Sequence, residues 1–255
     1  NNDLIYFDNG ATTLKPSIVV DAIKDYYTVY CANAHRGDYH NSVIVDDKYE
    51  GVREKVRKFI NAHDKSEIIF TSGATDGLNR VVMGYFKKFL NKGDEVLITN
   101  AEHASNVLPW FVLQKELGIK IEYIELDSNN EVVLENIEKA INKNTKVISL
   151  AYITNVIGDI RPIRDICEIA HKNNILVVGD AAQSLSHIKT DVTQDDIDFL
   201  VGSAHKIIGP TGLGFAYISS NAQKRLNFDL NAYEIAHYAD YDMPAIVGFD
   251  TSLQL

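Results

Sequence analysis

The feature that most constrains the fold is an alternation of short apolar runs with amphipathic segments, which begins near residue 66. Six runs rich in β-branched residues are predicted to be strands, at 67–70, 95–98, 120–124, 146–150, 175–178 and 197–201. Helices are predicted at 75–90, 106–117, 132–141 and 162–172, and two earlier ones at 17–30 and 43–62. Because such alternation is typical of parallel sheets, we predict an α/β fold, with a mostly parallel sheet covered by helices on both faces.

Composition narrows the kinds of partner and the environment. The formal net charge is -10, with acidic and basic residues interspersed, which argues against nucleic acid because phosphate binding needs a concentrated basic face. No apolar run approaches the roughly 18–20 residues of a membrane span, and the polar first residues do not fit a signal peptide. Cys31 and Cys167 cannot form a disulfide framework, so we expect a reducing, cytoplasmic setting.

The loops at the carboxyl ends of the strands are where a parallel sheet binds its ligands. The first strand is followed by TSGATDGL at 71–78, a turn that could bring helix N–H groups to an anion or could be an ordinary capped turn. It is not a Walker A loop, because no Gly-Lys-Ser/Thr follows. His103 follows the second strand, where it could stack on a flat ring or move protons, or be a surface histidine.

Three further strand ends carry polar side chains. Asn155 could bind a ring substituent or cap its own turn, and Asp180 could bind a protonated pyridine nitrogen or cap a helix. Lys206 leaves an apolar strand for a Gly/Pro-rich loop, where burial would favour Schiff-base chemistry, although a lone loop lysine is more often solvated. Together, an anion turn, a stacking histidine, a pyridinium acid and a lysine form the constellation that binds pyridoxal 5′-phosphate (PLP).

These motifs resemble those of the class V, fold-type I PLP enzymes, specifically the SufS/CsdA-type (group II) cysteine desulfurases. The matching segments, in the family's order, are YFDNGAT at 6–12, AHRGDYH at 34–40, FTSGATDG at 70–77, AEHASNVLPW at 101–110, GDAAQ at 179–183 and GSAHKIIGPTG at 202–212. The resemblance implies a seven-stranded large domain at 17–220, preceded by an N-terminal segment at 1–16. Residues 221–255 would be the end of that domain, or its junction to a small C-terminal domain that we expect the chain to lack.

The resemblance also implies roles for individual residues. Lys206 would hold PLP as a Schiff base and move protons, Asp180 would pair with the pyridine nitrogen, and His103 would stack on the ring. The other cofactor contacts would come from Ala74, Thr75, Asn155, Gln183, Ser203 and His205. His35 and Arg36 would lie in a substrate-side loop at the interface of a homodimer, and no metal ligand is expected. Many relatives carry threonine at position 74, so the contact there would be through the backbone alone.

The implied reaction converts L-cysteine to L-alanine and leaves the sulfur as an enzyme persulfide for an acceptor protein, as in iron–sulfur cluster assembly. The family's nucleophilic cysteine and carboxylate-binding arginine belong to the small domain. Neither Cys31 nor Cys167 matches that cysteine, so we expect the printed chain to be inactive. Residues 243–253 resemble the helix that follows a phosphate-binding E-x-G-T-P segment, and that segment is absent from the sequence.

Other functions remain open. One is a different class V activity, such as selenocysteine lyase, aminotransferase or epimerase, which would share the cofactor residues. Another is a non-catalytic fragment kept for dimerisation, although Lys206, Asp180 and His103 are all present. A Rossmann-like nucleotide binder is disfavoured, because no Gly-x-Gly-x-x-Gly turn with a downstream acid occurs.

Overall fold

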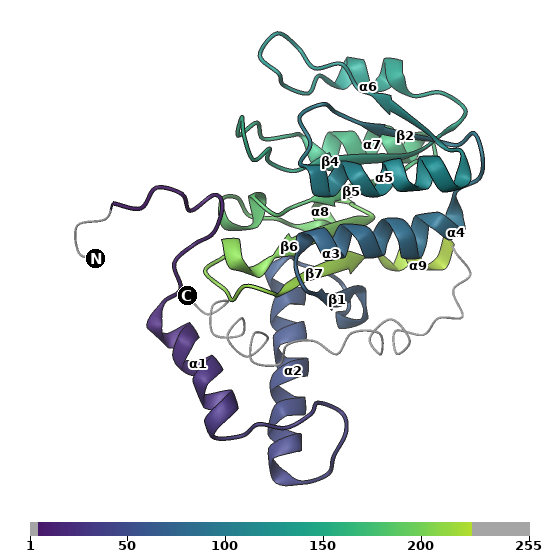
Figure 1. The fold of residues 1–255 in the computed structure, drawn as a ribbon. Coiled ribbons are helices and arrows are strands. Elements are labelled where there is room, and N and C mark those ends of the chain that lie inside the picture. Colours follow the sequence, from purple (N-terminus) through teal and green to yellow (C-terminus); the bar gives the residue numbers. More distant parts are fainter. Residues whose placement is uncertain (1–4, 226–255) are drawn as a thin grey trace.

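A single sheet of seven strands organises the computed structural model, which describes residues 5–225 (Figure 1). The strands are β1 (Ile68–Thr71), β2 (Glu95–Ile98), β3 (Lys120–Tyr123), β4 (Thr145–Ala151), β5 (Leu176–Asp180), β6 (Phe199–Ser203) and β7 (Gly214–Ile218). Their spatial order is β1-β7-β6-β5-β4-β2-β3, and β7 runs antiparallel to both of its neighbours while the other pairs are parallel. The predicted fold class is therefore confirmed.

Helices cover both faces of this sheet. One face carries α2 (His40–Phe59), α6 (Leu134–Ala140), α7 (Ile163–Lys172) and α8 (Val192–Asp195), and α1 (Ser17–Thr28) joins the apolar cluster of this face through Tyr26. The other carries α3 (Ala74–Asn79), the π-helical η2 (Arg80–Phe86), α4 (Lys87–Phe89), α5 (Ala104–Leu117) and α9 (Ser220–Arg225). Short 3₁₀ turns are η1 (Lys65–Glu67), η3 (Ser184–Ser186) and η4 (Ala204–Lys206).

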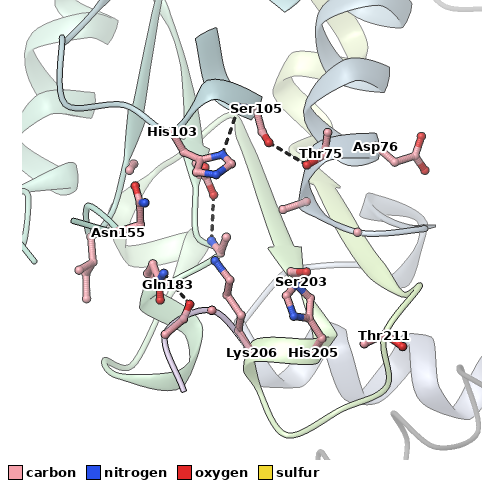
Figure 2. A pocket seen from close by; sticks show the side chains of 18 of the residues that line it. Thr75, Asp76, His103, Ser105, Asn155, Gln183, Ser203, His205, Lys206 and Thr211 are labelled. Carbon is pink, nitrogen blue, oxygen red and sulfur yellow. Dashed lines mark hydrogen bonds between the residues drawn. The ribbon is translucent and has the colours of Figure 1, made fainter. Parts of the chain in front are cut away.

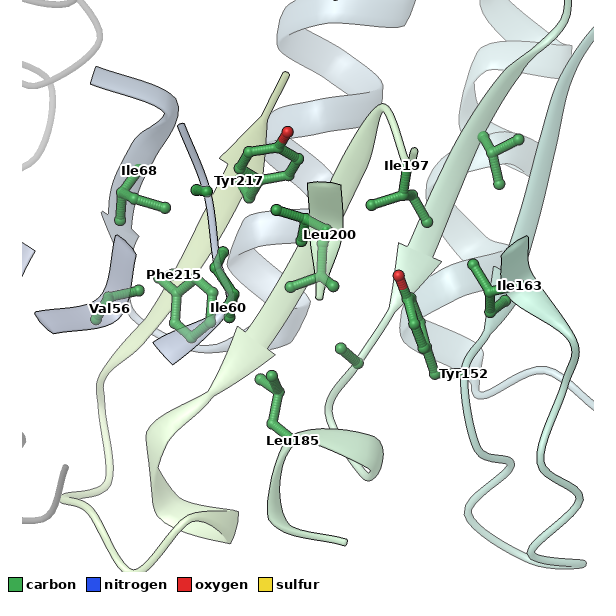
Figure 3. Packing of buried hydrophobic residues seen from close by; sticks show 14 of the residues in the cluster. Val56, Ile60, Ile68, Tyr152, Ile163, Leu185, Ile197, Leu200, Phe215 and Tyr217 are labelled. Atoms are coloured by element: carbon green, nitrogen blue, oxygen red, sulfur yellow. The ribbon is translucent and has the colours of Figure 1, made fainter. Parts of the chain in front are cut away.

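Strand residues point alternately to the two faces, which produces two apolar layers. Leu200 of β6 faces the α2 and α7 layer, whereas its neighbours Phe199 and Val201 face the α3 and α5 layer. Figure 3 shows the first layer, in which Leu200 and Phe215 of the sheet pack near Ile60, the residue after α2. Because both of their faces are buried, central strands such as β5 and β6 read as continuous apolar runs, and this made them recognisable in the sequence.

Three of the differences from the predicted elements have local causes. The helix predicted at 106–117 begins at Ala104, because the His103 side chain accepts a hydrogen bond from the Ser105 amide and caps it. The first strand begins at Ile68 because Glu67 closes a capping box with Asp64. The helix predicted at 75–90 is one continuous segment formed by α3, η2 and α4, since Arg80, the residue that follows α3, has helical backbone angles.

The sheet register brings the predicted strand ends together. Ala151 of β4 lies opposite Asp180 of β5, and Asp180 in turn lies opposite Val201 of β6. The start of α3 packs tightly on this edge, because a Cβ at Gly77 would lie 2.5 Å from Cγ1 of Val201. The carboxyl ends of the parallel strands β4, β5 and β6 and the start of α3 therefore meet at one edge of the sheet.

Two sequence predictions concern the C-terminal part of the chain. The helix-like segment at 243–253 lies outside the described residues, as does most of 221–255, and the division of the chain at residue 220 stays a prediction. Within residues 5–225, no helix is both long enough and apolar enough to cross a membrane.

Candidate active site

A cavity of about 750 Å³ opens at the carboxyl ends of the strands (Figure 2), within the roughly 300–1,000 Å³ typical of ligand sites. It brings together all nine residues predicted to bind the cofactor, Ala74, Thr75, His103, Asn155, Asp180, Gln183, Ser203, His205 and Lys206. They lie at the carboxyl ends of β5 and β6 or in the segments that follow β1, β2, β4, β5 and β6. The arrangement follows from the parallel sheet, because only in such a sheet do these loops share one edge.

A carboxylate and an amine of opposite charge face this cavity. Asp180 is only 5% exposed, and one of its oxygens accepts a hydrogen bond from the Ala182 amide at 2.9 Å. Burial raises the pKa of the Asp180 carboxyl, while that hydrogen bond and the positive charge of Lys206 act in the opposite direction. Burial lowers the pKa of the Lys206 amine, and the charge of Asp180 opposes this. Figure 2 shows the Lys206 side chain extending from η4 toward the space below His103.

The His103 ring is held at the rim by the helix that it caps. Its Nδ1 accepts a hydrogen bond from the Ser105 amide at 3.1 Å, so a neutral ring carries its hydrogen on Nε2. The residue is exposed toward solvent and lines the cavity, so one face of the imidazole is available to a ligand. This geometry suits stacking on a flat ring.

A buried ion pair fixes the loop that carries His103. The side chains of Glu102 and Arg161 are fully buried and hydrogen-bonded to each other. Glu102 also accepts hydrogen bonds from the amide of Ala151, at 2.8 Å, and from Asn106 of α5, at 3.0 Å. Because buried charges must be paired and hydrogen-bonded, this network ties the end of β2 to β4 and α5. The sequence prediction missed both charged residues, whose only signal was a glutamate next to His103.

The end of the cavity that lies opposite Asn155 and Gln183 is rich in hydrogen-bond donors (Figure 2). Thr75, Ser203 and His205 line it, together with the turn before α3, where Gly73 has a φ of 150° that favours glycine. The first N–H groups of a helix have no partner within the helix, so those of Ala74 and Thr75 are available to a ligand. Burial lowers the pKa of His205, and the charges of Lys206 and Lys15 lower it further, which favours a neutral imidazole.

The N-terminal segment forms one wall of the cavity. The carbonyl oxygen of His205 accepts hydrogen bonds from the Thr13 amide at 3.1 Å and from Lys15 Nζ at 2.7 Å. Gln183 donates a hydrogen bond to the carbonyl of Gly10 at 3.0 Å. Lining residues to which the sequence analysis gave no role include Asp8, Gly10, Ala11, Ser105 and Thr211. The first three belong to the YFDNGAT motif at 6–12, which was recognised in the sequence without roles for its individual residues.

His35, Arg36 and the two cysteines are not among the residues that line the cavity. The His35 ring packs on Tyr49 of α2, with its nitrogens 3.7 Å from Asp46 and from Glu50. Cys31 is exposed, whereas Cys167 is buried on α7, and burial raises the pKa of its thiol. Among the described residues, no cluster of three or more His, Cys, Asp or Glu side chains could hold a metal ion.

Comparison with known proteins identifies the class to which this fold and site belong. The model of the aminotransferase class-V family matches residues 5–234, so the chain belongs to that family. The PLP dependence of this family agrees with the residues gathered around the cavity.

Its relatives include cysteine desulfurases. A probable cysteine desulfurase of Halalkalibacterium halodurans is 42% identical over 214 residues, which cover 84% of this chain and 53% of that protein. The apo structure of the cysteine desulfurase from Thermococcus onnurineus NA1 has a TM-score of 0.92 at 33% identity, covering 99% of this chain and 67% of that one. A structure described as SspA in complex with cysteine has a TM-score of 0.86 at 27% identity, and the match covers 98% of this chain and 72% of that one. The chain spans about half the length of the curated relatives it matches.

Proposed function

We propose that this chain binds PLP on Lys206 and forms the cofactor domain of a cysteine desulfurase. The observation that carries the proposal is the buried carboxylate of Asp180, which faces the same cavity as the Lys206 amine. No ion pair within 4 Å joins Asp180 to another residue in the range 5–225. A buried carboxylate with one hydrogen bond and an open side suits a cationic ring nitrogen, so the residues fit the cofactor.

Each part of the cofactor has residues to hold it. Asp180 would accept the hydrogen of the ring nitrogen, His103 would cover one face of the ring, and Gln183 and Asn155 would contact its edge. The phosphate would lie at the donor-rich end, near Thr75, Ser203 and His205 and the amides of Ala74 and Thr75. When bound, PLP withdraws electrons from the substrate carbon that carries the amino group.

The protein's own groups would then move protons. Because burial lowers the pKa of Lys206, its amine is a free base at a lower pH than an exposed lysine would be. It can therefore act as the covalent anchor and, once displaced by the substrate amine, accept a proton from the substrate carbon. Asp180 would keep the ring nitrogen of a bound cofactor protonated, which would sustain the electron withdrawal that the cofactor supplies.

Cysteine is the substrate that the relatives favour. The curated relatives are described as cysteine desulfurases, and a related structure is described as a complex with cysteine. We propose that the complete protein converts L-cysteine to L-alanine and passes the sulfur to an acceptor protein. A thiolate must attack the substrate sulfur in this reaction, and neither Cys31 nor Cys167 lines the cavity. The nucleophile would therefore lie outside the 255 residues.

We also propose that the protein acts as a homodimer in the cytoplasm. Leu108, Phe111 and Val112 of α5 are 41–59% exposed, which suits a surface that a second copy covers. The loop with His35 and Arg36, which does not line the cavity of its own chain, would contribute to the site of the partner. The free thiols of Cys31 and Cys167 suit a reducing compartment. Sedimentation at micromolar concentration should give twice the mass of the 28.5 kDa chain, and a monomer alone would contradict the dimer.

The experiment that tests the cofactor proposal is an absorbance titration of the purified chain with PLP. The wild-type protein should develop the absorbance of a lysine-bound cofactor, and Lys206→Ala should abolish it. Lys92→Ala, which removes an exposed lysine outside the cavity, serves as the control and should titrate like the wild type. Retention of the absorbance by Lys206→Ala would refute the assignment.

A further inference from the structure

Two hydroxyl groups from different helices meet at the edge of the cavity. Ser105 is the second residue of α5 and Thr75 the second of α3, and their Oγ and Oγ1 atoms are 2.7 Å apart (Figure 2). Both residues line the cavity at the end where the phosphate is proposed to bind. No role for Ser105 was evident from the sequence.

A hydrogen bond between two hydroxyls constrains where their hydrogens point. One hydroxyl donates to the other, and the acceptor keeps its own hydrogen for another partner. If Ser105 donates to Thr75, the hydroxyl hydrogen of Thr75 points to another partner. If Thr75 donates to Ser105, the hydroxyl hydrogen of Ser105 does so. In either case, one O–H group of the pair has a restricted orientation and can donate a hydrogen bond to an anion in the cavity. Binding of the anion then costs less entropy than it would with a freely rotating hydroxyl.

The position of Ser105 is fixed from two sides. Its amide donates to Nδ1 of His103, which caps the helix. The next residue, Asn106, is buried and is held through its side chain by Glu102 at 3.0 Å and by Ser149 at 2.7 Å. The first turn of α5 is therefore anchored to the sheet, which fixes the backbone from which the Ser105 hydroxyl reaches Thr75.

The turn before α3 needs such a support. Position 74 is alanine, so Thr75 is the one side-chain hydroxyl at the first two positions of α3. A single threonine hydroxyl can rotate and can also bond back to its own helix. The hydrogen bond to Ser105 opposes both the rotation and the bond within the helix, and it holds the Thr75 hydroxyl at the cavity.

From this geometry we propose that Ser105 is a further residue of the phosphate site, where its hydroxyl donates to Thr75 and leaves the Thr75 hydrogen directed toward a phosphate oxygen. The inference rests on the proposed binding of PLP. It also makes Ser105 a link between the two ends of the cofactor, because its backbone positions the His103 ring and its side chain positions the phosphate turn.

Binding of PLP and of pyridoxal, which lacks the phosphate, separates this role from a structural one. Ser105→Ala removes the hydroxyl and keeps the amide that bonds to His103. We expect the variant to bind PLP about tenfold more weakly, because the Thr75 hydroxyl can then turn away and its hydrogen bond to the charged phosphate is largely lost, and to bind pyridoxal within about twofold of the wild type. The ³¹P resonance of bound PLP should also shift. Ser128→Ala makes the same chemical change at an exposed turn outside the cavity and should alter neither affinity.

A double-mutant comparison tests whether Ser105 acts through Thr75. In a Thr75→Val background, Ser105→Ala should weaken PLP binding by about twofold or less, because the hydroxyl that it orients is gone. Equal losses for PLP and pyridoxal, or wild-type PLP affinity in Ser105→Ala, would overturn the inference and leave the Lys206 assignment standing. A wild-type chain that binds no PLP would overturn both.

Discussion

The close packing of α3 on β6 gives a quantitative prediction about the position of the phosphate turn. A Cβ added at Gly77 would lie 2.5 Å from Cγ1 of Val201, whereas ordinary contacts between carbon atoms are about 3.5–4.0 Å. Gly77→Ala therefore requires helix and strand to separate by roughly 1 Å, or the stiff Val201 side chain to leave its rotamer. Overpacking of this kind costs about 1–3 kcal/mol.

A matched control lies in the same continuous helical segment. Gly84 is exposed, and a Cβ there would meet nothing within 4 Å. Gly84→Ala should therefore stabilise the protein by about 0.5–1 kcal/mol, because alanine restricts the unfolded chain more than glycine and has the higher helix propensity. Both substitutions gain the same propensity, so the difference between them isolates the packing cost. We expect Gly77→Ala to unfold about 1–3 kcal/mol more easily than Gly84→Ala, a difference in melting temperature of roughly 2–12 °C for a chain of this size.

Thermal unfolding followed by circular dichroism measures this difference, and a PLP titration of both variants adds a functional readout. Because Thr75 lies two residues before Gly77, a displaced α3 should also weaken PLP binding in Gly77→Ala but not in Gly84→Ala. Equal melting temperatures for the two variants would refute the inference that close packing on Val201 sets the position of the turn.

Three further predictions follow from individual residues. Contacts with Asp198 and Asp196 raise the pKa of His171 above its usual 6.5, so this group should stabilise the protein most below pH 6.5, and the stability should be lost as the pH rises through the folded-state pKa. Urea unfolding from pH 6 to 9 should show that loss in the wild type but not in His171→Gln, and a parallel loss in both would contradict it. Asp180→Asn should bind PLP roughly 10- to 150-fold more weakly, the loss of a charge-assisted hydrogen bond, and wild-type affinity would exclude Asp180 as the partner of the ring nitrogen. L-Cysteine added to the PLP-bound chain should change its spectrum without releasing stoichiometric alanine, and catalytic alanine production abolished by Cys31→Ala or Cys167→Ala would make that cysteine the nucleophile.

The parts of the site that were predictable from the sequence share one property. Asn155, Asp180 and Lys206 each follow a run of apolar residues, so local pattern alone locates them at strand ends, and the parallel sheet then brings them together. The buried strands β4, β5 and β6 were recognisable for the same reason, because burial on both faces makes their sequences continuously apolar.

The parts that were missed depend on contacts between distant segments. Glu102 and Arg161 are 59 positions apart, and nothing near either residue indicates that the two are paired and buried. The bond between Thr75 and Ser105 joins two helix starts that are 30 positions apart. The residue range of β7 was also not predicted, because this short strand follows a Gly/Pro-rich loop and runs against its neighbours, outside the strand–helix alternation that identified the others.

The most direct test of the central claim, that this cavity binds PLP covalently on Lys206, is reduction of the PLP-loaded chain with borohydride followed by peptide mapping. Reduction converts the linkage to a stable amine, so the modified lysine can be located by mass spectrometry. One cofactor per chain, on the peptide that contains Lys206, is the result we predict. A label on another lysine, or on several lysines in proportion to their exposure, would contradict the assignment of this cavity as the cofactor site.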